Sequence, residues 1–347
     1  MMQSQKFWLI GSIALIAIAF SITIFALSTV AKPIGSDFYF HLHMATLISQ
    51  GNISGAWAFP IEQNFFPYGF LAFHFLLSGL VLVGNTYFWA KLIEAILMPL
   101  TFTFTLYLIV KKVSAKAAFF TGLCLLGSIA FLDGTIQLRP ESLDILLYPL
   151  MLLAVLSVKK KTFVGLALVT IYSHSFAALS NILGVALKLL REQKWRKTIL
   201  AGLLLILPIV IVSFYYVQGA FHKWFTLAGA NQSNLQQTLF WTQPLIFIPF
   251  YSGLTLFGFV FLLKRHKNYF ETLLCYGILG SMIMIPFWAD RWLQYITIPL
   301  SCLVGLGLKD VSKTKLLVAT LILVSISFIY IYYWLNISYY HQWWQPT

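Results

Sequence analysis

The sequence predicts an all-helical protein that crosses a membrane many times. Its 347 residues are 60% hydrophobic and 17% aromatic but only 10% charged, whereas soluble domains are about 25% charged. Along the whole chain, apolar runs about one bilayer long alternate with short basic clusters. These observations argue against a soluble domain and predict one transmembrane domain over residues 1–347.

The basic clusters set the orientation of the predicted spans. The net charge of +13 does not indicate a nucleic-acid partner, because the bases are divided among short clusters between apolar runs. The positive-inside rule places all of these clusters in the cytosol, so an even number of crossings separates each pair. The clusters lie at residues 111–116, 159–161, 191–197, 264–267 and 309–315.

The first part of the chain predicts an anchor followed by an outer loop. The run from Phe7 to Val30 is longer than the core of a signal peptide, so we expect an uncleaved span. Residues 31–86 form the first extracytosolic loop. Within it, Phe65 to Val83 is expected to lie as an interfacial or re-entrant helix, because a further span there would place the 111–116 cluster outside.

The later apolar runs are broken by polar segments that we expect on the extracytosolic side. These breaks lie at Asp133 to Ser142, Ser173 to Ser175, Gln218 to Gln243 and Ala289 to Arg291. The resulting map has about eleven transmembrane helices, with the N-terminus inside and the C-terminus outside. In this map, seven of the ten acidic residues fall on the outer side. The positive-inside rule concerns basic residues, so it does not explain this distribution of the acids. This clustering indicates a function at the outer surface.

The segment directly after the first span holds the most informative polar residues. It reads Gly35-Ser36-Asp37-Phe38-Tyr39-Phe40-His41-Leu42-His43-Met44-Ala45. In a helix, Asp37 and His41 share one face because they are four residues apart. A carboxylate and an imidazole would then point together from the membrane surface. The alternative is a solvated interfacial acid beside an incidental histidine.

This segment resembles the GT-C superfamily of membrane glycosyltransferases, which includes the catalytic subunits of oligosaccharyltransferases and the protein and lipid mannosyl- or arabinosyltransferases. That family carries an acid in the first outer loop within a pattern like Asp-x-Tyr-x-(Asn/His)-x-x-x-Ala, matched here by Asp37, Tyr39, His41 and Ala45. The stretch Phe66-Pro67-Tyr68-Gly69 is similar to the family's Tyr-Pro-Gly element, which opens a helix in the same loop.

Further short elements resemble the family in the expected order. Arg139-Pro140-Glu141-Ser142-Leu143 is similar to the second acidic motif, and the turn at His174 is similar to the tip of the family's short paired spans. Arg291, which precedes Ile298-Pro299, is similar to a late outer arginine before a proline-bearing span. The resemblance implies a GT-C fold with juxtamembrane helices in the first outer loop.

The resemblance also implies an activity. It implies that a sugar, hexosyl or pentosyl, moves from a polyprenyl phosphate or diphosphate carrier to a lipid, glycan or protein acceptor outside the cytosol, in the membrane of a prokaryotic cell. Asp37 is then the general base, and Arg291 holds the phosphate. Arg139 shares this role or pairs with Glu141, which orients the acceptor or holds a metal. His41 and His174 are expected to bind substrate.

Two departures from the family pattern bear on cofactor and substrate. Members that use a metal carry a second acid in each acidic motif, where this chain has Gly35 and Arg139. A divalent cation such as Mg²⁺ or Mn²⁺ prefers several carboxylate oxygens, so we favour chemistry without a metal and keep the ion as an alternative. The large soluble domain of oligosaccharyltransferases has no counterpart in these residues, so transfer to asparagine is not expected.

Two other classes of function remain open from the sequence. A multi-span transporter or lipid flippase would have a similar composition, but it predicts polar groups deep in the spans and two halves that repeat each other. The ionisable residues here lie mostly at the ends of spans, which favours surface chemistry. A non-catalytic scaffold of a larger membrane assembly is the third class.

Overall fold

A computed structural model describes most of the chain. The described residues are 2–28, 36–62, 72–173, 181–208, 268–282 and 289–309, with a few isolated positions after them. Within these ranges the chain is almost entirely helical and contains no strand. The prediction of an all-α protein is therefore confirmed.

Twelve helices have assigned bounds and the connections between several of them are short. They are α1 (Met2–Ser28), α2 (Ser36–Ser49), α3 (Ile53–Glu62), α4 (Ala72–Val83), α5 (Thr86–Lys112), α6 (Ala115–Leu126), α7 (Ile129–Ile136), α8 (Pro140–Leu156), α9 (Lys160–Ser173), α10 (Asn181–Leu190), α13 (Tyr269–Ser281) and α14 (Ala289–Leu308). Residues 193–208 are also helical.

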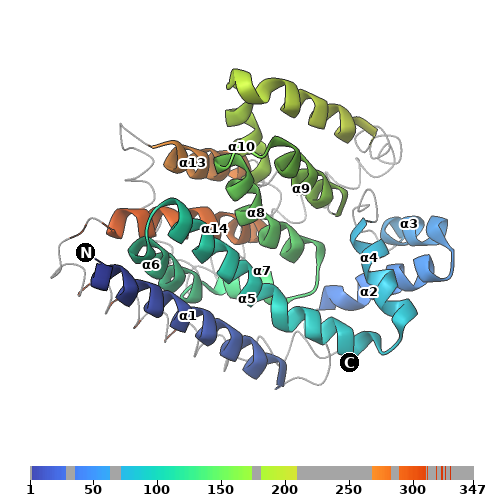
Figure 1. The fold of residues 1–347 in the computed structure, drawn as a ribbon. Coiled ribbons are helices and arrows are strands. Elements are labelled where there is room, and N and C mark those ends of the chain that lie inside the picture. The colour runs from blue at the N-terminus through green and yellow to red at the C-terminus, as the bar shows by residue number, and fades with distance from the viewer. Residues whose placement is uncertain are drawn as a thin grey trace.

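The helices form a main bundle with a smaller group at one side (Figure 1). In the bundle, α1 packs against α5 and α6, and α14 packs against α6 and α13. The helices α2, α3 and α4 gather at one end of α5. These three helices all fall in the predicted outer loop, residues 31–86, where juxtamembrane helices were expected.

Two described helices are long and apolar enough to cross a membrane, namely the stretches Gln5–Ser28 and Thr86–Lys112. Four shorter apolar helices occur at Ala72–Val83, Ala115–Leu126, Asn181–Leu190 and Gln294–Leu308. The predicted number of about eleven spans is not confirmed by these helices. The helix α4 is separate from α5, because Gly84 and Asn85 between them adopt left-handed backbone angles.

The apolar run between the basic cluster at 111–116 and the expected break at Asp133 forms two helices instead of one. The helix α6 ends at Leu126, and α7 begins three residues later at Ile129. Between them, Ser128 is extended and its hydroxyl accepts a hydrogen bond from the backbone N–H of Phe131 at 3.3 Å. Because α7 covers Asp133, the break expected at Asp133 to Ser142 is narrower than predicted, and its irregular part is residues 137–139.

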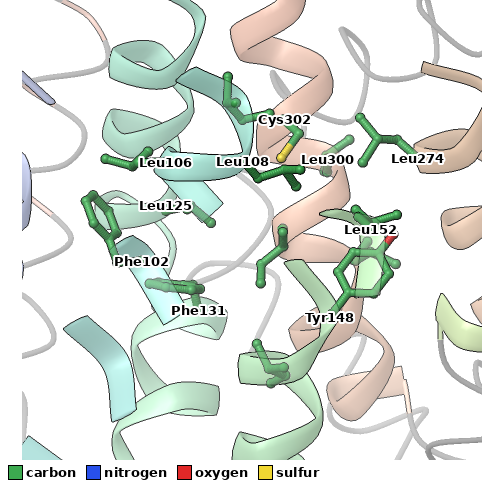
Figure 2. Packing of buried hydrophobic residues seen from close by; sticks show 14 of the residues in the cluster. Phe102, Leu106, Leu108, Leu125, Phe131, Tyr148, Leu152, Leu274, Leu300 and Cys302 are labelled. Atoms are coloured by element: carbon green, nitrogen blue, oxygen red, sulfur yellow. The ribbon is translucent and has the colours of Figure 1, made fainter. Parts of the chain in front are cut away.

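The apolar core lies where α5, α6, α7, α8 and α14 meet (Figure 2). Phe102 of α5 and Phe131 of α7 face each other with ring centroids 6.3 Å apart. The three cysteines, Cys124, Cys275 and Cys302, are buried and not bonded to each other. This rigid bundle fixes the positions of the helix ends that carry the polar residues described next.

Candidate active site

Arg139 and Glu141 lie together at the start of α8. Arg139 precedes the helix with extended backbone angles, and Pro140 occupies the first helical turn, a position that proline favours. Glu141 follows in the same turn, where a carboxylate interacts favourably with the positive end of the helix dipole. Both side chains are buried, with exposed fractions of 5% and 7%. The second predicted motif is therefore an internal polar site and not a solvated surface loop.

Arg139 is held by α14. Its Nη2 donates a hydrogen bond to the Oε1 of Gln294 at 3.0 Å, and Gln294 is also buried. Gln294 follows Arg291 by three residues, which corresponds to nearly one helical turn and a rise of about 4.5 Å along the helix axis. The backbone of residue 291 therefore lies one helical turn from the residue that contacts Arg139.

A second polar bridge lies beside the first. The hydroxyl of Tyr295 donates to the Oδ2 of Asp144 at 3.0 Å, and the Nδ2 of Asn181 donates to the backbone oxygen of Tyr295 at 2.6 Å. These bonds join the N-terminal parts of α8, α10 and α14. Because a buried polar group costs free energy unless it is hydrogen-bonded, the bridges fix the relative placement of the three helices.

The first acidic motif meets the second through an apolar cluster. Phe38 of α2 and Phe73 of α4 pack in one buried cluster with Leu138, the residue before Arg139. The carboxylate of Glu94 on α5 accepts a hydrogen bond from the backbone N–H of Leu138 at 3.3 Å. The start of α2, which carries Asp37, is thus packed in the same cluster as the segment that leads into Arg139.

His41 is buried between the juxtamembrane helices. Its exposed fraction is 1%, and its Nδ1 lies 2.9 Å from the Nε2 of His74 on α4, which is fully buried. Tyr39 of the same helix packs against Tyr87, and its buried hydroxyl has no hydrogen-bond partner among the described residues. Burial, followed by the nearby Tyr87 and Glu94, raises the pKa of Tyr39, so its phenol stays neutral and can donate a hydrogen bond.

The predicted site residues fall into three groups. Arg139, Glu141 and His41 are buried on helices that meet, as described above. Asp37 and Arg291 are the second residue of α2 and the third of α14, and their side chains lie outside the described part of the structure. His174 also lies outside the described residues. Whether Asp37 and Arg291 face one substrate stays a prediction.

Four residues of the polar network were not predicted as site residues: His74, Asp144, Gln294 and Tyr295. A signal for them was present, because each is polar or ionisable within an apolar run, and such residues in membrane helices usually face a partner or a functional site. Gln294 and Tyr295 also follow Arg291 at the spacing of one helical turn. Sequence alone gave no reason to pair them with residues some 150 positions earlier.

The described residues contain no group of three or more His, Cys, Asp or Glu side chains that could hold a metal ion. A small cavity lies between α8, α10 and α14, and the space inside it that a water molecule can occupy is about 10 Å³. Its polar lining comes from Asp144, Tyr148, Asn181 and Tyr295. A cavity of this volume is just large enough to hold one water molecule. This cavity therefore does not hold a sugar.

We expect Gln294→Leu to destabilise the protein by about 1–3 kcal/mol, because the buried guanidinium of Arg139 would lose its hydrogen bond to the Oε1 of Gln294. Thermal unfolding of the purified protein would measure the loss. A matched control is Thr272→Val, which removes a side-chain hydrogen bond at an exposed position and is expected to have a smaller effect. Equal stability of Gln294→Leu and the wild type would contradict the importance of this contact.

Comparison with known proteins finds similarity in structure only. No model of a protein family and no curated protein matches the chain. Among solved structures, ArnT from Cupriavidus metallidurans bound to undecaprenyl phosphate superposes with a TM-score of 0.55 at 18% sequence identity. The same protein in its apo state gives a TM-score of 0.54 at 16% identity.

The similarity covers most of this chain but not all of ArnT. In both comparisons 90% of this chain is covered, and the chain spans 63% of the length of the ArnT chains. The composition of the chain and its two long apolar helices support an integral membrane protein. The comparison therefore shows that this chain has the fold of ArnT over most of its length, in agreement with the fold expected from its short motifs.

Proposed function

We propose that this protein is a glycosyltransferase that moves a sugar from a polyprenyl phosphate or diphosphate carrier to an acceptor on the extracytosolic face. The observation that carries this proposal is the fold shared, over 90% of the chain, with a structure of ArnT bound to undecaprenyl phosphate. The buried Arg139 and Glu141 support it, because two helices converge on them at the predicted outer end.

The proposed reaction is a displacement at the anomeric carbon of the sugar. The acceptor oxygen forms a bond to that carbon, and the bond between carbon and the carrier phosphate oxygen breaks. The phosphate leaves with the electron pair, and the acceptor proton passes to the carboxylate of Asp37. A positioned carboxylate commonly accelerates such a proton transfer about 10²- to 10⁴-fold.

The two arginines act on the leaving group in this proposal. Negative charge grows on the phosphate as the bond breaks, so cations near it stabilise the transition state more than the bound substrate. Arg139 and Arg291 supply planar guanidinium groups that can hold two phosphate oxygens at once. Glu141 orients the acceptor, and His41 and His174 bind the substrate. No step in this scheme requires a divalent cation.

The direct test is a transfer assay with the full-length protein in lipid vesicles. A panel of polyprenyl-phosphate sugars is added from the outer side together with lipid, glycan and peptide acceptors that carry free hydroxyl groups, in EDTA or with Mg²⁺ or Mn²⁺, and release of polyprenyl phosphate is measured. We expect release from at least one donor, also in EDTA. Movement of the intact lipid across the vesicle bilayer without cleavage would indicate a flippase instead. A rate of release that depends on added Mg²⁺ or Mn²⁺ would show that a metal ion takes part in the reaction.

We expect Arg291→Gln to lower kcat by about 10²- to 10³-fold, because one charged donor to the leaving phosphate is lost. Arg291→Lys should keep part of the rate, since its charge remains but its two-point contact does not. The rate of transfer under saturating donor measures both effects. Lys161→Gln, which removes an exposed cation at the predicted cytosolic side, serves as the charge control. An unchanged kcat in Arg291→Gln would exclude the proposed clamp.

A further inference from the structure

Two buried histidines contact each other between α2 and α4. His41 and His74 have exposed fractions of 1% and 0%, and the Nδ1 of His41 lies 2.9 Å from the Nε2 of His74. Phe73 packs edge-on against His41, with ring centroids 5.4 Å apart and planes at 79°. The rings are therefore shielded from solvent and held in one orientation.

The short contact links the protonation patterns of the two rings. A neutral imidazole has one donor and one acceptor nitrogen, so one of the facing nitrogens donates and the other accepts. When the Nδ1 of His41 donates, its Nε2 carries a lone pair and can only accept. When the Nε2 of His74 donates, the Nε2 of His41 carries the proton and can only donate. The contact therefore couples the tautomer of His41 to that of His74, and loss of His74 would remove this constraint on the second nitrogen of His41.

The pair belongs to the same part of the fold as the proposed site. His41 is one turn after Asp37 on α2, so the two positions share a helix face. Phe38 of the same helix and Phe73, the neighbour of His74, pack in one cluster with Leu138, which precedes Arg139. A change in the orientation of His41 would therefore occur beside Asp37.

We propose that His74 is a positioning residue, which fixes the tautomer and ring orientation of His41 so that His41 offers one defined nitrogen to an oxygen of the lipid-linked sugar. This inference rests on the proposed function, in which His41 binds substrate. His74 itself touches no substrate atom and acts only through His41. A purely structural role would require burial of His74 but no defined tautomer of His41.

The kinetic test compares His74→Phe with His74→Gln in the vesicle assay. Phenylalanine fills the space but cannot bond to His41, so we expect kcat/KM to fall about tenfold, as for other groups that orient an imidazole. Glutamine can still donate or accept, and should restore most of the activity. The variant His43→Gln changes a histidine of the same helix that packs on Phe59, and it should keep the wild-type rate.

A double variant separates positioning from an independent effect. If His74 acts through His41, then His41→Gln with His74→Phe should be no slower than His41→Gln alone. Multiplied losses in the double variant, or wild-type kcat/KM in a folded His74→Phe protein, would overturn the inference.

A spectroscopic measurement tests the pair without any activity. The ¹⁵N shifts of labelled histidine distinguish the two tautomers, and the signals of His41 are assigned by their loss in His41→Gln. We expect one tautomer of His41 in the wild type and a mixture in His74→Phe; the same mixture in both proteins would overturn the inference. If the wild type transfers sugar from no donor, the proposed function fails, while this spectrum still decides whether His74 fixes His41.

Discussion

Replacement of Asp37 by Asn is expected to lower kcat for sugar transfer by about 10²- to 10⁴-fold while the KM for the lipid donor changes little. The amide has nearly the shape of the carboxylate but cannot take a proton from the acceptor hydroxyl. An interaction that matters only in the transition state lowers kcat and kcat/KM together. Initial rates of polyprenyl phosphate release over a range of donor concentrations measure both constants.

The control for Asp37→Asn is Glu62→Gln, which removes another acid of the same predicted outer loop, at the end of α3. We place Glu62 in no site, so its variant should transfer sugar at the wild-type rate. If Asp37→Asn and the wild type are equally fast, Asp37 is not the base. An equal loss in both variants would point to the charge of the loop and not to a specific proton acceptor.

The largest expected effect on stability comes from Gly184→Val. A Cβ added at Gly184 on α10 would collide with the backbone oxygen of Tyr276 on α13, and one at Gly280 would collide with the backbone of Gly184. The two helices therefore touch through their backbones, as small residues allow in membrane proteins. Valine would force them apart, and we expect a loss of about 3 kcal/mol or more in the free energy of unfolding.

The midpoint of thermal unfolding in detergent measures this loss. The smaller variant Gly184→Ala covers the case in which the valine protein does not accumulate, and it should also be destabilised. Gly165→Ala in α9 and Gly79→Ala in α4 are matched controls, because an added Cβ meets no atom within 4 Å at either position. These controls should be neutral or up to about 1 kcal/mol more stable, since alanine favours a helix. Equal stability of Gly184→Ala and its controls would show that α10 and α13 do not pack this closely.

Much of the helical architecture could be predicted because hydropathy and charge act locally along the chain. The long helix α5, Thr86–Lys112, ends at the basic pair Lys111 and Lys112, where a cytosolic boundary was expected. The division between α6 and α7 at Gly127 and Ser128 was missed, because hydropathy hardly changes there. That break depends on the hydrogen bond of the Ser128 side chain to Phe131, a feature of geometry and not of polarity.

The candidate site was predictable only in part. Arg139 and Glu141 were found from their motif, and the structure places them in a buried position. Their partner Gln294 could not be predicted, because a single polar residue in an apolar run does not say which distant helix it faces. His74 could be recognised from the sequence as a polar residue in an apolar run, but its contact with His41 depends on how α2 and α4 pack.

The amino-acid pattern alone thus determined the helical class, the short motifs around Asp37, Arg139 and Arg291, and the side of the membrane on which we expect them. These features follow from hydrophobicity and charge, which act residue by residue. Only the tertiary structure decided that Arg139 bonds to Gln294 and that His41 bonds to His74. Such pairings arise because buried polar groups need partners, and the packing of helices far apart in sequence selects which partner each one meets.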